Sequence, residues 1–304
     1  MSRPGRAGCK SARSPRPSTP MRVPAARSRC ARRMAGFSLV ELIVVMVVLG
    51  ILGASVAAFI DGPVRAWFDT LRRAQMTESA DAALRRLTRE LQGALPNSPR
   101  VTSAGGTVFL EFVPVIDGGR YRALPASDGS GDALDFADAT DNRFDVLGPA
   151  VQVSAGSQLV VFNLGSAESD VYAGNNRRAV TSSAGSATQI SFAANGTALP
   201  AESPLRRFHL VAAPVTYACT PQAGGGGQLV RISGYGFAAA QPASLTSGAL
   251  ASGQRALVLD HVSACSFAFG PALQHQRLLA GALALTRDGE TITLQAQVAL
   301  PNTP

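Results

Sequence analysis

The first 36 residues of the chain contain no aspartate or glutamate. The same segment holds ten of the 28 lysines and arginines, so the rest of the chain has 18 basic and 20 acidic residues and a net charge of about −2. The overall net charge of +8 therefore comes from one short leader, not from a basic surface spread over a folded domain. This distribution argues against a nucleic-acid partner.

Histidine is scarce, and His209, His261 and His275 lie far apart with no metal-ligand spacing. The chain has no G-x-S-x-G sequence to present a nucleophilic serine. Its glycine run 224–227 is not followed by the Lys-Ser or Lys-Thr of a phosphate-binding loop, so we expect a flexible loop there. The sequence thus predicts no catalytic residue, no cofactor and no enzymatic activity.

One acidic segment resembles a metal loop at first sight, and its aspartates are Asp128, Asp132, Asp135, Asp138, Asp141 and Asp145. An EF-hand loop needs acids at alternate positions, a glycine at its sixth position and a glutamate at its twelfth. The segment 128–145 lacks that register, so we expect solvated turns and no metal. Calcium binding by this segment stays open as the alternative.

A long apolar run extends from Phe37 to Ile60, 24 residues. At about 1.5 Å per residue, a helix of this length covers roughly 36 Å, enough to cross a hydrocarbon core of about 30 Å. Arg32 and Arg33 come directly before it, which predicts a cytoplasmic N-terminus and a chain that lies outside after residue 60. The alternative is a cleaved secretory signal, whose apolar region of 7 to 15 residues is shorter than this run.

The next segment changes from uniformly apolar to amphipathic. Asp61-Gly62-Pro63 is expected to interrupt the helix, because glycine is a weak helix former and proline removes a donor. Apolar residues then recur at spacings of three and four, which predicts an amphipathic helix over 61–95 that ends before Pro96. Those positions are Val64, Trp67, Phe68, Leu71, Ala74, Ala80, Ala83, Leu84, Leu87, Leu91 and Leu95.

From residue 96 onward the sequence favours strands. Short β-branched and aromatic runs alternate with Gly, Ser, Asn and Asp clusters, at 107–115, 158–164, 188–193, 208–215, 228–233, 255–269 and 278–300. Asp288-Gly289 within the last run is a strong two-residue hairpin signal. We therefore predict an α+β fold in which a long N-terminal helix packs on an antiparallel β-sheet head.

The residues at the start of the apolar run carry a specific resemblance. Gly36-Phe37-Ser38-Leu39-Val40-Glu41 resembles the class III signal G-F-[ST]-L-x-E of type IV prepilins and type II secretion pseudopilins. The resemblance implies that a prepilin peptidase cuts between Gly36 and Phe37 and methylates the new N-terminus at Phe37. It also implies that Glu41 pairs with the terminal amine of the next subunit and sets the register of a filament.

The residue types suit those roles on physical grounds. A glycine at position 36 lets a protease approach the backbone without a side chain in the way. An isolated carboxylate near the membrane interior is costly and calls for a partner, for which a free amine at Phe37 would serve. In the alternative interpretation, Glu41 merely extends to the lipid headgroups. Whether translation starts at Met1 or Met21 stays open, and the leader is basic in both cases.

A second resemblance covers about the last hundred residues. They look like the MSHA pilus biogenesis protein MshO family of minor prepilins, related to the J-type minor pseudopilin. The matching segments, in order, are Pro214–Cys219, Leu229–Tyr235, Val262–Phe267, Gly289-Glu290 and Gln297-Val298. Ala296 stands where family members often have histidine, and this departure weakens the subfamily assignment. The resemblance implies major and minor pilins or pseudopilins as partners; a J-type minor pseudopilin and a single-pass adhesin remain the alternatives.

The four cysteines divide between leader and body: Cys9 and Cys30 precede the predicted cut, and Cys219 and Cys265 follow it. One even pair outside the cytoplasm predicts a Cys219–Cys265 disulfide, with two buried free thiols as the alternative. The predicted organisation is a cleaved leader (1–36), a transmembrane half-helix (37–60), an amphipathic half-helix (61–95) and a β-rich head (96–304). The pilin-like arrangement implies an inner-membrane protein with a periplasmic head that later joins a pilus or pseudopilus.

Overall fold

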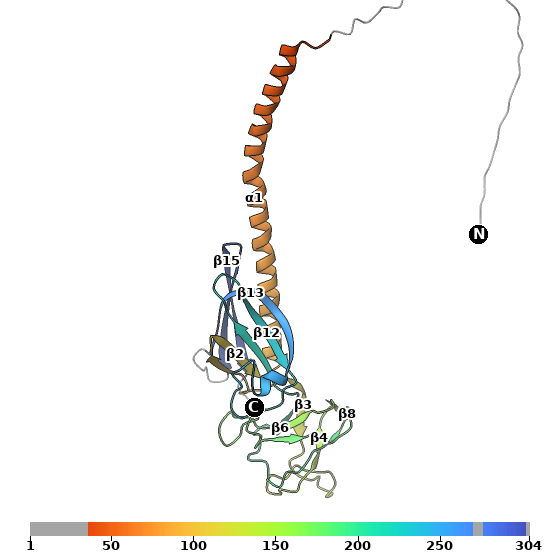
Figure 1. Cartoon of the computed structure of the whole chain (residues 1–304). Coiled ribbons are helices and arrows are strands. Elements are labelled where there is room, and N and C mark those ends of the chain that lie inside the picture. The colour runs from red at the N-terminus through yellow and green to blue at the C-terminus, as the bar shows by residue number, and fades with distance from the viewer. Residues whose placement is uncertain (1–35, 270–275, 302–304) are drawn as a thin grey trace, which may run out of the picture. The chain divides into compact units, whose positions relative to one another are not determined.

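The computed structural model describes residues 36–269 and 276–301. These residues form one long helix, α1 (Leu39–Gln92), a short 3-10 helix (Ala249–Ser252) and strands β1 to β15 (Figure 1). The boundary between two compact units falls between Gly62 and Pro63. The predicted α+β class, one long N-terminal helix followed by antiparallel sheets, is confirmed.

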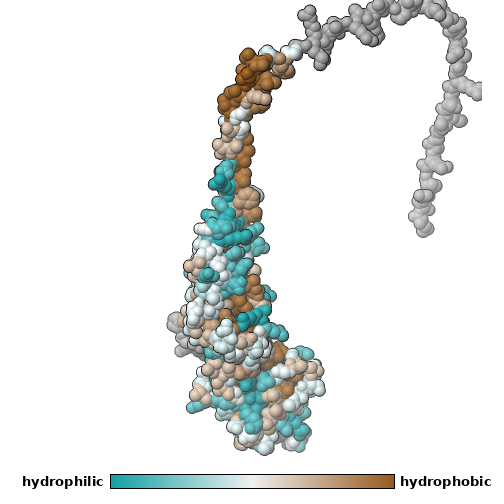
Figure 2. Space-filling model, viewed as in Figure 1, coloured by the Kyte–Doolittle hydropathy of each residue, from teal (hydrophilic) through white to brown (hydrophobic). Residues whose placement is uncertain are grey.

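The described part of the first unit consists of the start of α1 and the three residues before it. Every residue from Gly36 to Gly62 is exposed. This part of the helix is long and apolar enough to cross a membrane by length and composition, and Figure 2 shows its start in brown. The apolar side chains of this part of the helix pack on no protein core among the described residues, which supports membrane anchoring.

Pro63 lies inside α1, so the expected interruption at Asp61-Gly62-Pro63 was wrong. Proline removes a single donor, here the one that would bond the carbonyl of Phe59 four residues earlier. Ending the helix and starting a new one would instead leave four backbone groups unsatisfied at each new end. One lost hydrogen bond is the smaller cost, and the helix continues to Gln92.

In the second unit, α1 packs on the inner face of a seven-stranded sheet. The helix residues buried there are Met76, Ala80, Ala83, Leu84, Leu87 and Leu91. The expectation that Val64, Trp67, Phe68, Leu71 and Ala74 belong to the same covered face was wrong, because all five are exposed. The helix ends three residues earlier than expected, and Leu95 is buried in the turn that follows.

The seven strands are all antiparallel, in the order β1-β2-β11-β12-β13-β14-β15. They are β1 (Arg100–Ala104), β2 (Thr107–Phe112), β11 (Val215–Thr220), β12 (Gly227–Ser233), β13 (Gln254–Phe269), β14 (Gln276–Arg287) and β15 (Glu290–Pro301). The predicted hairpin between β14 and β15 is confirmed. Asp288 and Gly289 have φ values of 51° and 84°, the left-handed pair that a tight two-residue turn needs.

A second sheet, of six strands, lies beyond the C-terminal end of α1 (Figure 1), in the order β7-β6-β10-β3-β4-β9. Its strands are β3 (Val115–Tyr121), β4 (Arg143–Leu147), β6 (Gln158–Val161), β7 (Arg177–Ala179), β9 (Gln189–Ser191) and β10 (Arg207–Val211); β5 (Val151–Val153) and β8 (Gly185–Ala187) pair separately. The second sheet has its own core, in which the rings of Phe144 and Phe208 meet edge to face at 5.0 Å. Each sheet therefore has a large core of its own, and two smaller clusters of buried apolar residues accompany them.

The chain passes between the two sheets at two prolines. Pro114 separates β2 from β3, and Pro214 lies between β10 and β11. The sequence predicted a single strand through each of these points, at 107–115 and 208–215, and both predictions merged strands of different sheets. Proline cannot donate to a strand ladder, so it suits a point where one ladder ends and another begins.

Buried polar side chains join the two sheets where they meet. Asn163, which is 1% exposed, donates to the carbonyl of Pro96 at 2.7 Å and accepts from the amide of Val171 at 2.9 Å. The hydroxyl of Tyr172 donates to the carbonyl of Ser98 at 2.9 Å. These bonds link the turn after α1 to the loops of the second sheet.

Candidate functional site

The Gly36-Phe37 peptide bond lies in open space before α1. Gly36, Phe37 and Ser38 have no regular secondary structure, and Phe37 is 77% exposed. A Cβ atom placed on Gly36 would meet no atom within 4 Å. The chain itself thus has room for a side chain at position 36, and any demand for glycine there has to come from another molecule.

Ser38 begins the helix as its N-cap. Its side-chain oxygen accepts a hydrogen bond from the amide of Glu41 at 3.2 Å, and its carbonyl accepts one from the amide of Leu42 at 3.2 Å. Serine at the N-cap with glutamate three residues later is the sequence of a capping box. The spacing S-x-x-E was visible in the sequence, but its local structural role was not recognised there.

Glu41 lies in the first turn of α1 with its side chain exposed. It is the one charged residue of the segment 37–60. A carboxylate in the first turn is favoured by the partial positive charge of the helix N-terminus. A cut after Gly36 would add an amine at Phe37, just before the cap and four residues before this carboxylate. The predicted cut site therefore lies next to the helix start and its one acid.

The comparisons with known proteins agree with this signal. A family model described as the prokaryotic N-terminal methylation motif matches residues 31–57. The match includes Gly36, Phe37 and Glu41, and it supports a type IV prepilin-like class III signal on a pilin-like or pseudopilin-like precursor. No curated protein and no solved structure matches the chain.

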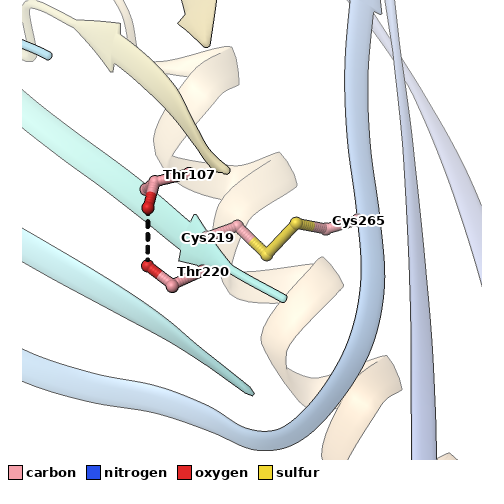
Figure 3. The surroundings of a disulfide bond; sticks show 4 residues. All are labelled: Thr107, Cys219, Thr220 and Cys265. Carbon is pink, nitrogen blue, oxygen red and sulfur yellow. Dashed lines mark hydrogen bonds between the residues drawn. A yellow bond between two sulfur atoms is a disulfide. The ribbon is translucent and has the colours of Figure 1, made fainter. Parts of the chain in front are cut away.

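The two cysteines of the head lie together in the structure (Figure 3). The sulfur atoms of Cys219 in β11 and Cys265 in β13 are placed as a disulfide, with Cα atoms 6.6 Å apart. Strand β12 separates β11 from β13 in the sheet, and its first residue, Gly227, pairs with Val262. The link therefore joins two strands that are not neighbours in the sheet. Cys219 lies opposite Leu229 of β12, and Cys265 lies three residues beyond Val262, the partner of the first β12 residue. Cys9 and Cys30 lie outside the described residues.

The glycine run 224–227 forms a close-packed turn, not the flexible loop expected from its composition. A Cβ atom on Gly225 would collide with the carbonyl oxygen of Thr286, and Gly225 has a φ of 89°. A Cβ atom on Gly227 would collide with the carbonyl oxygens of Val262 and Thr220. Glycine is needed here because two backbones approach each other closely.

The aspartates of 128–145 serve as turn and arginine partners. Hydrogen bonds from the amide and hydroxyl of Ser130 lower the pKa of Asp128. Hydrogen bonds from the amide and hydroxyl of Thr140 lower the pKa of Asp138 in the same way. Asp145 accepts from the amide of Asp132 and pairs with Arg122 at 3.2 Å. Across residues 36–269 and 276–301, no three His, Cys, Asp or Glu side chains are grouped so that they could hold a metal ion.

A buried ion pair in the head has a structural role. Glu111 is fully buried and accepts from Arg100 at 2.7 Å and from the hydroxyl of Tyr235 at 2.8 Å. Burial raises the pKa of Glu111, and these two hydrogen bonds oppose that rise. Arg100 also donates to the carbonyls of Ala238 and Ala239, and its guanidinium stacks 3.5 Å from the ring centre of Tyr172. The pair thereby fixes the 235–239 segment to β1 and β2.

The two histidines that the structure describes, His209 and His261, do not converge. His209 lies in β10 and His261 in β13, in different sheets, and His275 lies outside the described residues. Burial, with a smaller contribution from the charge of Arg207, lowers the pKa of His209 to about 4. His209 is therefore neutral at physiological pH, and its strand pairs with β3 on one side and β6 on the other.

Proposed function

We propose that this chain is the precursor of a minor pilin or pseudopilin, a structural subunit and not an enzyme. A prepilin peptidase removes residues 1–36 by cutting between Gly36 and Phe37, and it methylates the amine of Phe37. The observation that carries the proposal is the signal Gly36–Glu41 at the start of an apolar helix whose residues are all exposed as far as Gly62.

In this proposal, residues 37–60 hold the subunit in the inner membrane with the N-terminus in the cytoplasm and the head 96–304 in the periplasm. The basic leader beside the apolar run supports this orientation. Glu41 pairs with the methylated amine of a neighbouring subunit and sets the axial register. Burying one carboxylate in an apolar environment is unfavourable by itself, so a neighbour that supplies the opposite charge favours assembly.

For the particular system, we favour a role in initiating an MSHA-like pilus. The support is the order of segments that resemble the MshO family, from Pro214–Cys219 to Gln297-Val298. The alternative is a J-type minor pseudopilin of type II secretion. A single-pass adhesin that keeps its leader is the other alternative, and it differs from both in the N-terminus of the mature chain.

Mass spectrometry of the N-terminus tests the proposal in cells that carry the prepilin peptidase. We expect a mature chain that starts at methylated Phe37, and Gly36→Leu should prevent its formation. Gly50→Leu is the matched control, because neither glycine has an atom within 4 Å of its Cβ position. Processing of Gly36→Leu at the same rate as Gly50→Leu, or a wild-type chain that retains its leader, would refute the proposal.

A further inference from the structure

An exposed apolar face continues on α1 after the predicted membrane segment. Val64, Trp67, Phe68 and Leu71 are spaced at i, i+3, i+4 and i+7, so they share one side of the helix. They are 44%, 69%, 56% and 45% exposed, respectively. We call these four residues the collar face.

The collar face points away from the head. At about 100° per residue, its mean direction lies roughly half a helical turn from that of the buried residues Met76 to Leu91. The β14–β15 hairpin reaches α1 at Arg72 and Arg73, through ion pairs to Asp288 at 3.4 Å and Glu290 at 2.9 Å. The head therefore covers the opposite side of the helix and meets it C-terminal to the collar face.

The residues around the collar face divide sharply by polarity. At about 100° per residue, the charged residues near the collar face lie on the other side of α1, the side that the sheet covers nearer the C-terminal end of the helix. They are Arg65, Asp69, Arg72 and Arg73. The collar face itself combines a tryptophan, a phenylalanine and two aliphatic residues. Aromatic residues with nearby arginines are typical of the layer where a membrane meets water.

The length of chain before the collar face fits the same layer. Trp67 follows Phe37 by 30 residues, which at about 1.5 Å per residue corresponds to roughly 45 Å of helix. A bilayer with its headgroups is about 40 to 45 Å thick. If Phe37 starts at the inner surface, Trp67 comes at the outer one.

We propose that the collar face binds the outer headgroup layer of the membrane before assembly. The one-sided polarity lets the helix emerge obliquely, with the collar face toward lipid and the arginine side toward water, as interfacial helices do. The contact holds the head close to the bilayer at a defined depth. This inference rests on the proposed membrane-anchored subunit and adds a second, interfacial anchor to it.

Trp67 is the one tryptophan of the chain, so its fluorescence reports on this face alone. The full chain is reconstituted in phosphatidylcholine–phosphatidylglycerol vesicles that contain lipids brominated either near the headgroup or near the chain end. We expect blue-shifted emission, stronger quenching by the shallow bromines than by the deep ones, and weak quenching by aqueous iodide. The double variant Trp67→Phe, Leu124→Trp is the control, because Leu124 is 68% exposed on the head and should report water.

Each other outcome overturns the inference. If the protein floats with the vesicles but Trp67 emits like the tryptophan of the control, the interfacial contact is disproved and the membrane anchor stands. Loss of flotation would disprove both. A blue shift that bromine does not quench and that grows with the ratio of protein to lipid would show that a second copy of the chain, not lipid, covers the collar face.

Discussion

The side-chain oxygen of Ser38 accepts a hydrogen bond from the amide of Glu41 at 3.2 Å. The two residues therefore act together in starting α1, while the carboxylate of Glu41 extends outward from the same turn. The backbone of Glu41 serves the helix cap and its side chain is available for another charge. These two roles can be separated by substitution.

The first prediction concerns the charge of Glu41. Glu41→Ala should leave cleavage after Gly36 intact but reduce incorporation into filaments, because the terminal amine of the neighbouring subunit then has no carboxylate to pair with. Mature mass and recovery in sheared filaments measure the two steps. Glu41→Gln is the matched control for shape, and we expect it to fail like Glu41→Ala. Normal recovery of either variant would contradict a charge role.

The second prediction concerns the cap. Ser38→Ala should destabilise the first turn of α1 by about 1 kcal/mol, because the amide of Glu41 loses its acceptor. Ser38→Thr keeps an acceptor oxygen and should retain most of that stability. Amide hydrogen exchange at Glu41, measured on the full chain in detergent micelles, should be faster in the alanine variant alone. Equal exchange in all three proteins would show that the cap contributes nothing.

The third prediction concerns the cysteine pair. The Cys219–Cys265 link closes a loop with a sequence separation of 46 residues. In the chain-entropy model, a loop of this size contributes on the order of 3 to 4 kcal/mol. Replacing both residues with alanine should lower the free energy of unfolding by about that amount. Reductant should destabilise the wild-type protein and leave the double variant unchanged. Free-thiol labelling, without reductant, of the mature protein that has lost Cys9 and Cys30 would contradict the link.

The fourth prediction concerns the glycine turn. Gly225→Ala should be strongly destabilising, because its Cβ atom would collide with the carbonyl of Thr286 as well as force an unfavourable positive φ. Gly224→Ala is the matched control: its φ of 83° is similar, but nothing lies within 4 Å of its Cβ position. The control should cost about 1 kcal/mol from backbone strain alone. Equal thermal midpoints for the two variants would refute the close packing.

The fifth prediction is a pH dependence set by His209. Its pKa of about 4 in the folded protein lies below the ordinary value of 6.5, so the unfolded chain takes up the proton first. Stability should therefore fall as the pH drops from about 6.5 to about 4, by up to about 3 kcal/mol. His209→Gln should flatten this part of the stability profile. An unchanged profile in that variant would assign the pH dependence to other groups.

Local patterns were enough for several features. The apolar run with its exposed helix, the α+β class and the Asp288-Gly289 hairpin follow from composition and from turn residues that act over a few positions. Long-range features were not accessible in this way. The strand runs at 107–115 and 208–215 were each predicted as one strand, because propensity does not register a change of sheet at Pro114 or Pro214.

The sequence by itself determined that a long apolar helix begins next to Phe37 and where the signal Gly36–Glu41 lies, because each depends on residues a few positions apart. The tertiary structure decided which side of α1 the head covers. It also decided that the two sheets each form a core of their own and that Gly225 lies against Thr286. These outcomes depend on contacts between residues distant in the chain, whose packing outweighs local preference.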